Sequence, residues 1–157
     1  MGAKVNSLIN TGQAWRLLTC AFLHGGLMHI AFNMYALKVI GSEVEYAYGK
    51  KKYLFIYLFS VLGGSLFSYL FNANGISVGA SGAIFGLFGA MLIFGFKNRK
   101  NIGKEYMMSI FKVVLINILI GVTISNIDNF AHIGGLIFGG VLAAIVKNKK
   151  LYWDRSI

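Results

Sequence analysis

The sequence has no proline, a single cysteine and few charged residues. Charged side chains make up 13% of its 157 residues and hydrophobic ones 57%, whereas soluble domains are about a quarter charged. So much apolar side chain excludes intrinsic disorder, and the lone Cys20 excludes a disulfide framework within the chain. The lack of proline and of a three-residue glycine period excludes collagen. A mean hydropathy of +0.67 indicates that lipid is the solvent.

Five apolar stretches are long enough, or nearly so, to cross a bilayer, which takes roughly 20 residues. They cover residues 22–40, 53–71, 80–96, 107–124 and 131–146, and the last is the shortest. No repeat, low-complexity tract or second domain is visible. We therefore predict an all-α fold, a polytopic transmembrane helix bundle that forms a single domain over residues 1–157.

The placement of the basic residues, rather than the net charge of +10, predicts the orientation of these stretches. Lys38 and Lys112 lie near the ends where their long stems can reach the interface, and Lys4 and Arg16 lie on the opposite side. Since cytoplasmic loops are rich in Lys and Arg, the crowded side is predicted to be cytoplasmic. Nucleic-acid binding is the weaker interpretation, because the topology already explains the clusters. The eleven cations on the crowded side are Lys50, Lys51, Lys52, Lys97, Arg99, Lys100, Lys104, Lys147, Lys149, Lys150 and Arg155.

This orientation makes the first, third and fifth stretches run from outside to inside, so the amino terminus is predicted to lie outside. The short segment that begins at Met1 has no apolar signal stretch before it that would carry it across. We therefore expect that a preceding helix is missing from this chain.

Four polar side chains lie at one predicted depth, a little below the outer surface. His29 and Asn33 are in the outer half of the first stretch, Ser81 opens the third and His132 opens the fifth. Polar groups within a span are costly and usually face the bundle interior or a water-filled cavity. His29 and Asn33 are four residues apart and so share one helix face. An interhelical polar contact, worth about 0.6 kcal/mol on average, is their structural alternative.

Two glycine spacings suggest that Ser81 and His132 meet. The third stretch contains Gly82-x-x-x-Gly86 and the fifth Gly135-x-x-x-Gly139, and such small-residue faces allow two helices to approach closely. Ser81 precedes its glycine pair by one residue and His132 by three, an axial offset of about 3 Å. Close packing of these faces would place the hydroxyl and the imidazole at similar heights.

A serine next to a histidine can act as a nucleophile, because the imidazole accepts its proton. Donors for an oxyanion are the second requirement, and His29, Asn33 and the backbone N–H of Ser81 can supply them. Asp128 is the only acidic residue on the outer side and precedes His132 by four, so a Ser-His dyad is favoured over a triad. A helix N-cap serine is the structural alternative for Ser81.

These motifs together resemble the rhomboid family of intramembrane serine proteases, from about residue 2 to residue 146. The resemblance implies that Ser81 is the nucleophile, that His132 is the general base, and that His29 and Asn33 support the oxyanion. It implies no cofactor, and the histidines lack a metal-site pattern. The matching motifs are Trp15-Arg16, His24 with His29-x-x-x-Asn33, Gly79-Ala80-Ser81-Gly82, and Ala131-His132-x-x-Gly135-x-x-x-Gly139.

The resemblance also implies the substrates and the place of action. We expect cleavage of transmembrane segments of single-pass membrane proteins within the lipid bilayer, with no nucleic-acid partner. We expect a multi-pass protein of a prokaryotic plasma membrane, with its active site open to the outer side. The loop over residues 125–130 and the helix before it are expected to act as a gate, by analogy with the family.

Three departures from the family pattern shape the alternatives. The family core has six helices and this chain predicts five; Phe85 stands where many members carry a tyrosine stacked on the histidine; Cys20 stands where proline is common. A catalytically inactive rhomboid-like protein that binds transmembrane clients is therefore an alternative. A small transporter is another, although the inverted internal repeat that it predicts is not visible.

Overall fold

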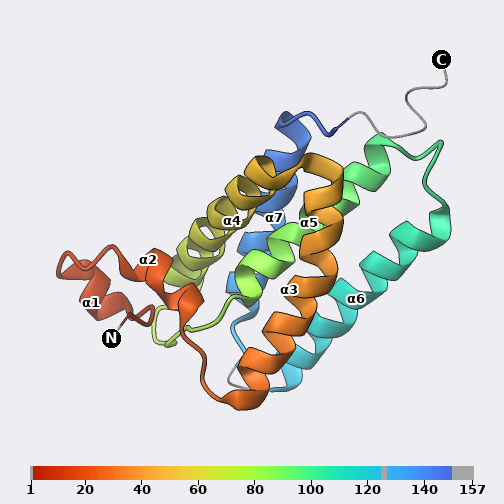
Figure 1. Cartoon of the computed structure of the whole chain (residues 1–157). Coiled ribbons are helices and arrows are strands. Elements are labelled where there is room, and N and C mark those ends of the chain that lie inside the picture. Colours follow the sequence, from red (N-terminus) through yellow and green to blue (C-terminus); the bar gives the residue numbers. More distant parts are fainter. Residues whose placement is uncertain (1, 125–126, 150–157) are drawn as a thin grey trace.

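The computed structural model describes residues 2–124 and 127–149, and within these ranges it contains helices and no β-strand (Figure 1). The prediction of an all-α fold is confirmed. One isolated antiparallel bridge joins Lys4 to Ser77. The elements are α1 (Asn6–Asn10), α2 (Arg16–Thr19), the 3-10 helix η1 (Cys20–Phe22), α3 (Leu27–Tyr48), α4 (Lys50–Phe71), α5 (Ser81–Lys97), α6 (Lys104–Thr123) and α7 (Asn129–Ile145).

The five long helices correspond to the five apolar stretches, and α4 to α7 match their predicted ends to within three residues. The first stretch, predicted over residues 22–40, is wrong at both ends. The chain bends by 95° between the short helices that end at Phe22 and the start of α3, because Gly26 adopts an extended conformation before the helix begins. At the other end α3 continues eight residues past Ile40, through polar Ser42 and two glutamates.

Gly49 ends α3 and begins the turn into α4. Its φ is +88°, in the left-handed region that side chains with a Cβ avoid. Its N–H donates to the carbonyl of Glu45, which closes the last turn of α3. The helix α3 therefore ends at Gly49, where the backbone conformation requires it. This position lies well beyond Ile40, the predicted end of the first apolar stretch.

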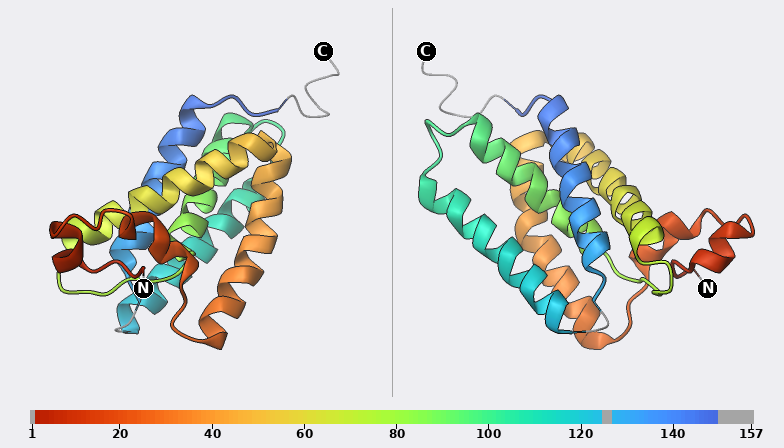
Figure 2. Two further views of the ribbon diagram at one scale, coloured as in Figure 1. Left: turned by 60° about the vertical axis from the view of Figure 1, so that its left-hand side comes forward. Right: turned by 180° about the vertical axis from the view of Figure 1, so that it is seen from behind.

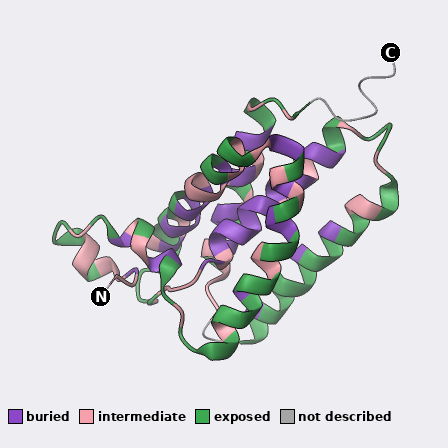
Figure 3. Cartoon of the chain, in the orientation of Figure 1, coloured by how far each residue is buried: buried purple, intermediate pink, exposed green. Residues whose placement is uncertain are grey.

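The helix α5 occupies the middle of the bundle and contacts α3, α4, α6 and α7 (Figures 1 and 2). Eleven of its 17 residues are buried. In contrast, α6 lies at one side and buries only Ile110, Val114 and Gly121 of its 20 described residues. Figure 3 shows this difference as a buried centre and a largely exposed α6. The third apolar stretch is thus the core of the fold.

Glycines let α5 and α7 pack backbone to backbone, as their spacing predicts. A Cβ added to Gly135 would lie 1.8 Å from the carbonyl oxygen of Gly82, and one added to Gly139 would lie 2.1 Å from that of Gly86. No side chain fits in either place. The two glycine pairs therefore set the register between the helix that begins at Ser81 and the helix that carries His132.

The lengths of the helices suit a bilayer to different degrees. By length and composition α4 and α6 can each cross a membrane, and residues 16–22 together with α3 qualify as one broken span. The apolar helices α5 and α7 are shorter, with 17 residues each, or about 25 Å against a hydrocarbon core of about 30 Å. The described basic residues of the crowded side lie together at the end where α3, α5 and α7 terminate (Figure 1). Lys150 and Arg155 lie outside the described residues.

Candidate active site

Ser81 and His132 lie next to each other at the opposite end of the bundle from the basic residues. Ser81 is the first residue of α5 and His132 the fourth of α7. The distance between Oγ of Ser81 and Nε2 of His132 is 2.9 Å, which is a hydrogen bond. His132 is buried, whereas Ser81 is half-buried. A hydroxyl bonded to an imidazole can be deprotonated as it attacks an electrophile.

The imidazole of His132 is held from one side by Phe85, one turn further along α5. The two rings are stacked with centroids 4.1 Å apart and an angle of 4° between their planes. Within the part of the chain that the structure describes, Nδ1 of His132 is buried and has no hydrogen-bond partner. His132 is thus hydrogen-bonded to Ser81 and packed against the ring of Phe85.

Asp128 is bonded elsewhere and does not orient the histidine ring. It caps the N-terminus of α7, where its Oδ1 accepts from the N–H of Ala131 at 3.2 Å, and its backbone carbonyl accepts from the N–H of His132. Its Oδ2 accepts from the hydroxyls of Ser68, on α4, and of Ser77. Asp128 therefore fixes the start of the helix that carries His132.

The charge state of Asp128 follows from these contacts. Burial of the carboxyl raises its pKa, but the hydrogen bonds from Ser68, Ser77, the Ala131 backbone and Asn72 outweigh burial, so the pKa lies below its ordinary value. The carboxylate is therefore negative at neutral pH and remains an acceptor for the groups around it.

Lys4 completes this polar network from the amino-terminal segment. Its side chain is fully buried, and its ammonium donates to the carbonyls of Asn72 at 2.7 Å and Gly75 at 3.2 Å. Its backbone exchanges two hydrogen bonds with Ser77. Since Ser77 also donates to Asp128, one chain of bonds runs from Lys4 to the start of α7. Sequence reasoning assigned Lys4 only to the outer side.

His29 and Asn33 lie on α3, on the side of the site formed by the loop before Ser81. A Cβ added to Gly79 would lie 2.7 Å from Nε2 of His29, so the imidazole occupies the space beside this glycine, whose φ is +120°. His24 packs edge-on against His29, with ring centroids 5.1 Å apart.

Asn33 faces the interior without a direct bond to the dyad. One of its amide N–H groups donates to the carbonyl of His29 at 2.8 Å, and its Oδ1 is buried without a partner among the described residues. The ring of His29 thus lies beside Gly79, which precedes Ser81 by two residues, and Asn33 lies one helical turn further along α3.

Two further predicted features have a structural role or fall outside the description. Arg16 is buried and donates to the carbonyl of Ala3 and to the side chain of Gln13, while its neighbour Trp15 is exposed. Residues 125–126 of the predicted gate loop lie outside the described residues. In the described ranges no group of three or more His, Cys, Asp or Glu side chains is placed to hold a metal ion.

Comparison with known proteins identifies the family and several relatives of this chain. A model of the Rhomboid domain matches residues 11–149. The chain is 48% identical over 143 residues to the rhomboid protease GluP of Bacillus subtilis, covering 91% of this chain and 28% of that protein. It is 40% identical over 148 residues to RHOMBOID-like protein 1 of Arabidopsis thaliana, covering 92% and 38%. It is also 34% identical over 143 residues to the putative rhomboid protease YdcA of B. subtilis, covering 90% and 72%.

The apolar bundle, with a serine and a histidine at one end, is thus that of an integral membrane protein related to proteases. The chain belongs to the rhomboid family. It spans well under half the length of the first two relatives, so it is compared with their rhomboid portion alone.

Proposed function

We propose that this chain is an intramembrane serine endopeptidase that cleaves transmembrane segments of single-pass membrane proteins with a dyad of Ser81 and His132. The observation that carries the proposal is the 2.9 Å hydrogen bond between Oγ of Ser81 and Nε2 of His132. The glycine-faced packing of α5 against α7 holds the two groups in place. This pre-set geometry supplies the positioning on which the reaction depends.

In the proposed acylation step, Nε2 of neutral His132 takes the hydroxyl proton while Oγ of Ser81 attacks the peptide carbonyl carbon. The carbonyl π pair moves onto oxygen and forms a tetrahedral oxyanion. On collapse the C–N bond breaks, and the imidazolium returns its proton to the leaving amine. Water then attacks the acyl-enzyme with His132 again as base, and this releases the second product and restores the serine.

The oxyanion needs hydrogen-bond donors, each worth roughly 2.7–4 kcal/mol of barrier. The backbone N–H of Ser81 is available because the first N–H groups of a helix have no partner within it. The position of His29 beside Gly79 supports a role for its Nε2–H as a second donor. The buried amide of Asn33 has one N–H left after its bond to His29 and is the proposed third.

We infer that the site opens to the outer side of a prokaryotic plasma membrane, because the basic ends of the helices belong on the cytoplasmic side. A substrate helix must unwind at the level of Ser81, since a helical peptide bond is internally hydrogen-bonded and its carbonyl is shielded. No cofactor takes part in this chemistry.

Covalent labelling tests the proposal and separates it from an inactive rhomboid-like binder. The purified chain in detergent is treated with a fluorescent fluorophosphonate, and cleavage of a single-pass substrate is followed in parallel. We expect stoichiometric labelling and cleavage that both disappear in Ser81→Ala. In His132→Ala both fall at least about a hundredfold, because the serine loses its base.

Ser109→Ala is the matched control. Ser109 is exposed on α6, and its hydroxyl donates within its own helix to the carbonyl of Tyr106 at 2.7 Å, so its loss should change neither readout. Labelling that persists in Ser81→Ala would refute the assigned nucleophile. A folded wild-type chain that neither labels nor cleaves would refute the protease and favour client binding.

A further inference from the structure

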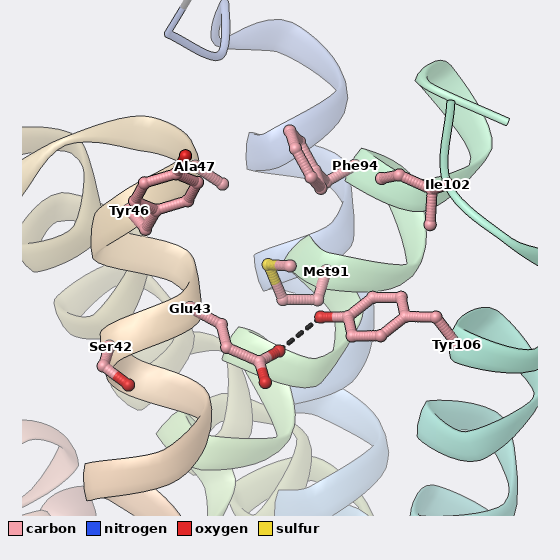
Figure 4. Close-up of a pocket in the computed structure, with 8 residues that line it drawn as sticks. All are labelled: Ser42, Glu43, Tyr46, Ala47, Met91, Phe94, Ile102 and Tyr106. Atoms are coloured by element: carbon pink, nitrogen blue, oxygen red, sulfur yellow. Dashed lines mark hydrogen bonds between the residues drawn. The ribbon is translucent and has the colours of Figure 1, made fainter. Parts of the chain in front are cut away.

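A cavity that includes neither Ser81 nor His132 lies between α3, α5 and α6, toward the basic end of the bundle (Figure 4). Its volume is about 370 Å³, within the range of about 300–1,000 Å³ that small-ligand sites occupy. Its lining comes from the last two turns of α3, from the second half of α5, from the connection after α5 and from the first turn of α6. The lining residues are Ser42, Glu43, Tyr46, Ala47, Met91, Phe94, Ile102 and Tyr106.

The chemistry of the cavity suits a hydrocarbon chain. Met91 and Phe94 of α5 form an apolar wall, and Ala47 and Ile102 add aliphatic surface. The carboxylate of Glu43 accepts a hydrogen bond from the hydroxyl of Tyr106, and this pair joins α3 to α6 (Figure 4). The carboxylate therefore already has a partner and does not require a polar ligand.

Basic residues flank one lining residue of the cavity in the sequence. Arg99, Lys100 and Lys104 are exposed and surround the lining residue Ile102 in the chain. Lys104 also lies two residues before Tyr106. Glu43 is five residues from the end of α3, about 7 Å deeper along the helix. The carboxylate of Glu43 therefore lies deeper in the bundle than the end of α3.

We propose that this cavity binds an anionic phospholipid from the leaflet at the basic end, with one acyl chain between α3 and α6 and its phosphate near Lys100 and Lys104. Basic sites between membrane helices on the Lys- and Arg-rich side are suited to such headgroups. The proposal does not depend on the dyad.

Native mass spectrometry of the full chain tests this site. The chain in mild detergent receives equimolar phosphatidylglycerol and phosphatidylethanolamine with the same acyl chains. We expect one retained lipid with a preference for phosphatidylglycerol. In the double variant Lys100→Gln/Lys104→Gln, the ratio of bound phosphatidylglycerol to bound phosphatidylethanolamine should fall about fivefold for each cation removed. The matched control Lys50→Gln/Lys51→Gln carries the same charge change at the start of α4, on the side of α3 away from α6 (Figure 1).

Filling the cavity tests the acyl-chain part of the proposal. Ser42→Trp adds an indole from an exposed position that lines the cavity, and Ile102→Trp does so from the connection before α6. Both should reduce lipid retention at least about fivefold, while Leu54→Trp, on the exposed surface of α4, should not. Helical content and monodispersity verify that each variant is folded. Two cavity variants are used so that the test does not depend on a single variant that fails to fold.

Three results would overturn the proposal: equal retention of the two lipids by the wild type, unchanged retention in both tryptophan variants, or equal losses in the two lysine pairs. Ser81→Ala should retain phosphatidylglycerol like the wild type. The lipid site and the proposed proteolysis can therefore fail independently.

Discussion

The ring of Phe85 lies flat against the imidazole of His132, with centroids 4.1 Å apart and planes that differ by 4°. Both rings are buried, and the hydrogen bond from His132 to Ser81 leaves from the edge of the stacked imidazole. Phe85 thus restricts the rotation of a side chain whose other ring nitrogen has no partner among the described residues. The sequence predicted an aromatic face at this position, and the stacking gives it a physical role.

Replacing Phe85 with leucine should slow the proposed reaction more than it weakens substrate binding. Aromatic stacking contributes about 0.5–1.5 kcal/mol beyond buried area, so kcat should fall roughly two- to twelvefold with KM little changed. Phe85→Tyr keeps the ring face and should retain kcat to within about threefold. Steady-state cleavage of a fluorogenic transmembrane substrate measures both constants. Wild-type kcat in Phe85→Leu would show that the stacking has no part in turnover.

The rate of cleavage should rise from acid toward neutral pH, because only neutral His132 can accept the proton of Ser81. An unperturbed histidine changes charge at about pH 6.5, near the middle of the physiological range. The measurement is kcat/KM in detergent from about pH 8 down to the acid limit of folding, with circular dichroism at each pH to verify folding. A rate that does not fall with acidification anywhere in the range where the chain stays folded would exclude His132 as the base.

Gly135→Ala should destabilise the bundle strongly, whereas Gly140→Ala, five residues further along α7, should not. The added methyl at Gly135 would meet the carbonyl oxygen of Gly82 at 1.8 Å, but at Gly140 the nearest atom is 3.7 Å away. Overpacking costs about 1–3 kcal/mol, and a backbone neighbour cannot rotate away, so we expect the upper end for Gly135→Ala. Unfolding of the purified chain in mixed micelles compares the two variants. Equal stability would contradict the backbone contact.

The sequence predicted those parts of the molecule that depend on local patterns. The lengths of the apolar stretches and the charges between them predicted α4 to α7. The glycine spacing predicted that Ser81 and His132 lie close together. It failed at the ends of α3, because polar residues can continue a helix until a residue such as Gly49 stops it.

Two other contacts between distant segments could not be read from the sequence. Lys4 donates to carbonyls in the segment just after α4, 68 and 71 residues away, and Glu43 accepts a hydrogen bond from Tyr106 across 63 residues. Neither pair follows a motif or a periodicity. A lysine near the start of a chain ordinarily lies in water, so no local signal indicates that this one is buried.

Asp128→Asn should weaken the acid sensitivity of folding. The folded-state pKa of Asp128 lies below its ordinary value because hydrogen bonds outweigh burial, so its stabilisation is present above the unfolded pKa of about 3.9 and is lost as pH falls through the lower folded pKa. Thermal unfolding between about pH 5 and pH 2.5 should therefore show a larger acid loss in the wild type than in Asp128→Asn. Glu105→Gln, at an exposed carboxylate of α6, is the control and should follow the wild type.

Lys4→Met tests whether the amino-terminal segment holds the loop before Ser81. The substitution keeps an unbranched apolar stem but removes the ammonium, so the carbonyls of Asn72 and Gly75 lose their donor. A buried acceptor without a partner costs about 1–3 kcal/mol, and we expect a loss of this size in the free energy of unfolding. Lys51→Met, at an exposed position, should change it by less than about 0.5 kcal/mol. If both variants unfold like the wild type in mixed micelles, the Lys4 network does not stabilise the fold, and its link to Asp128 has no energetic weight.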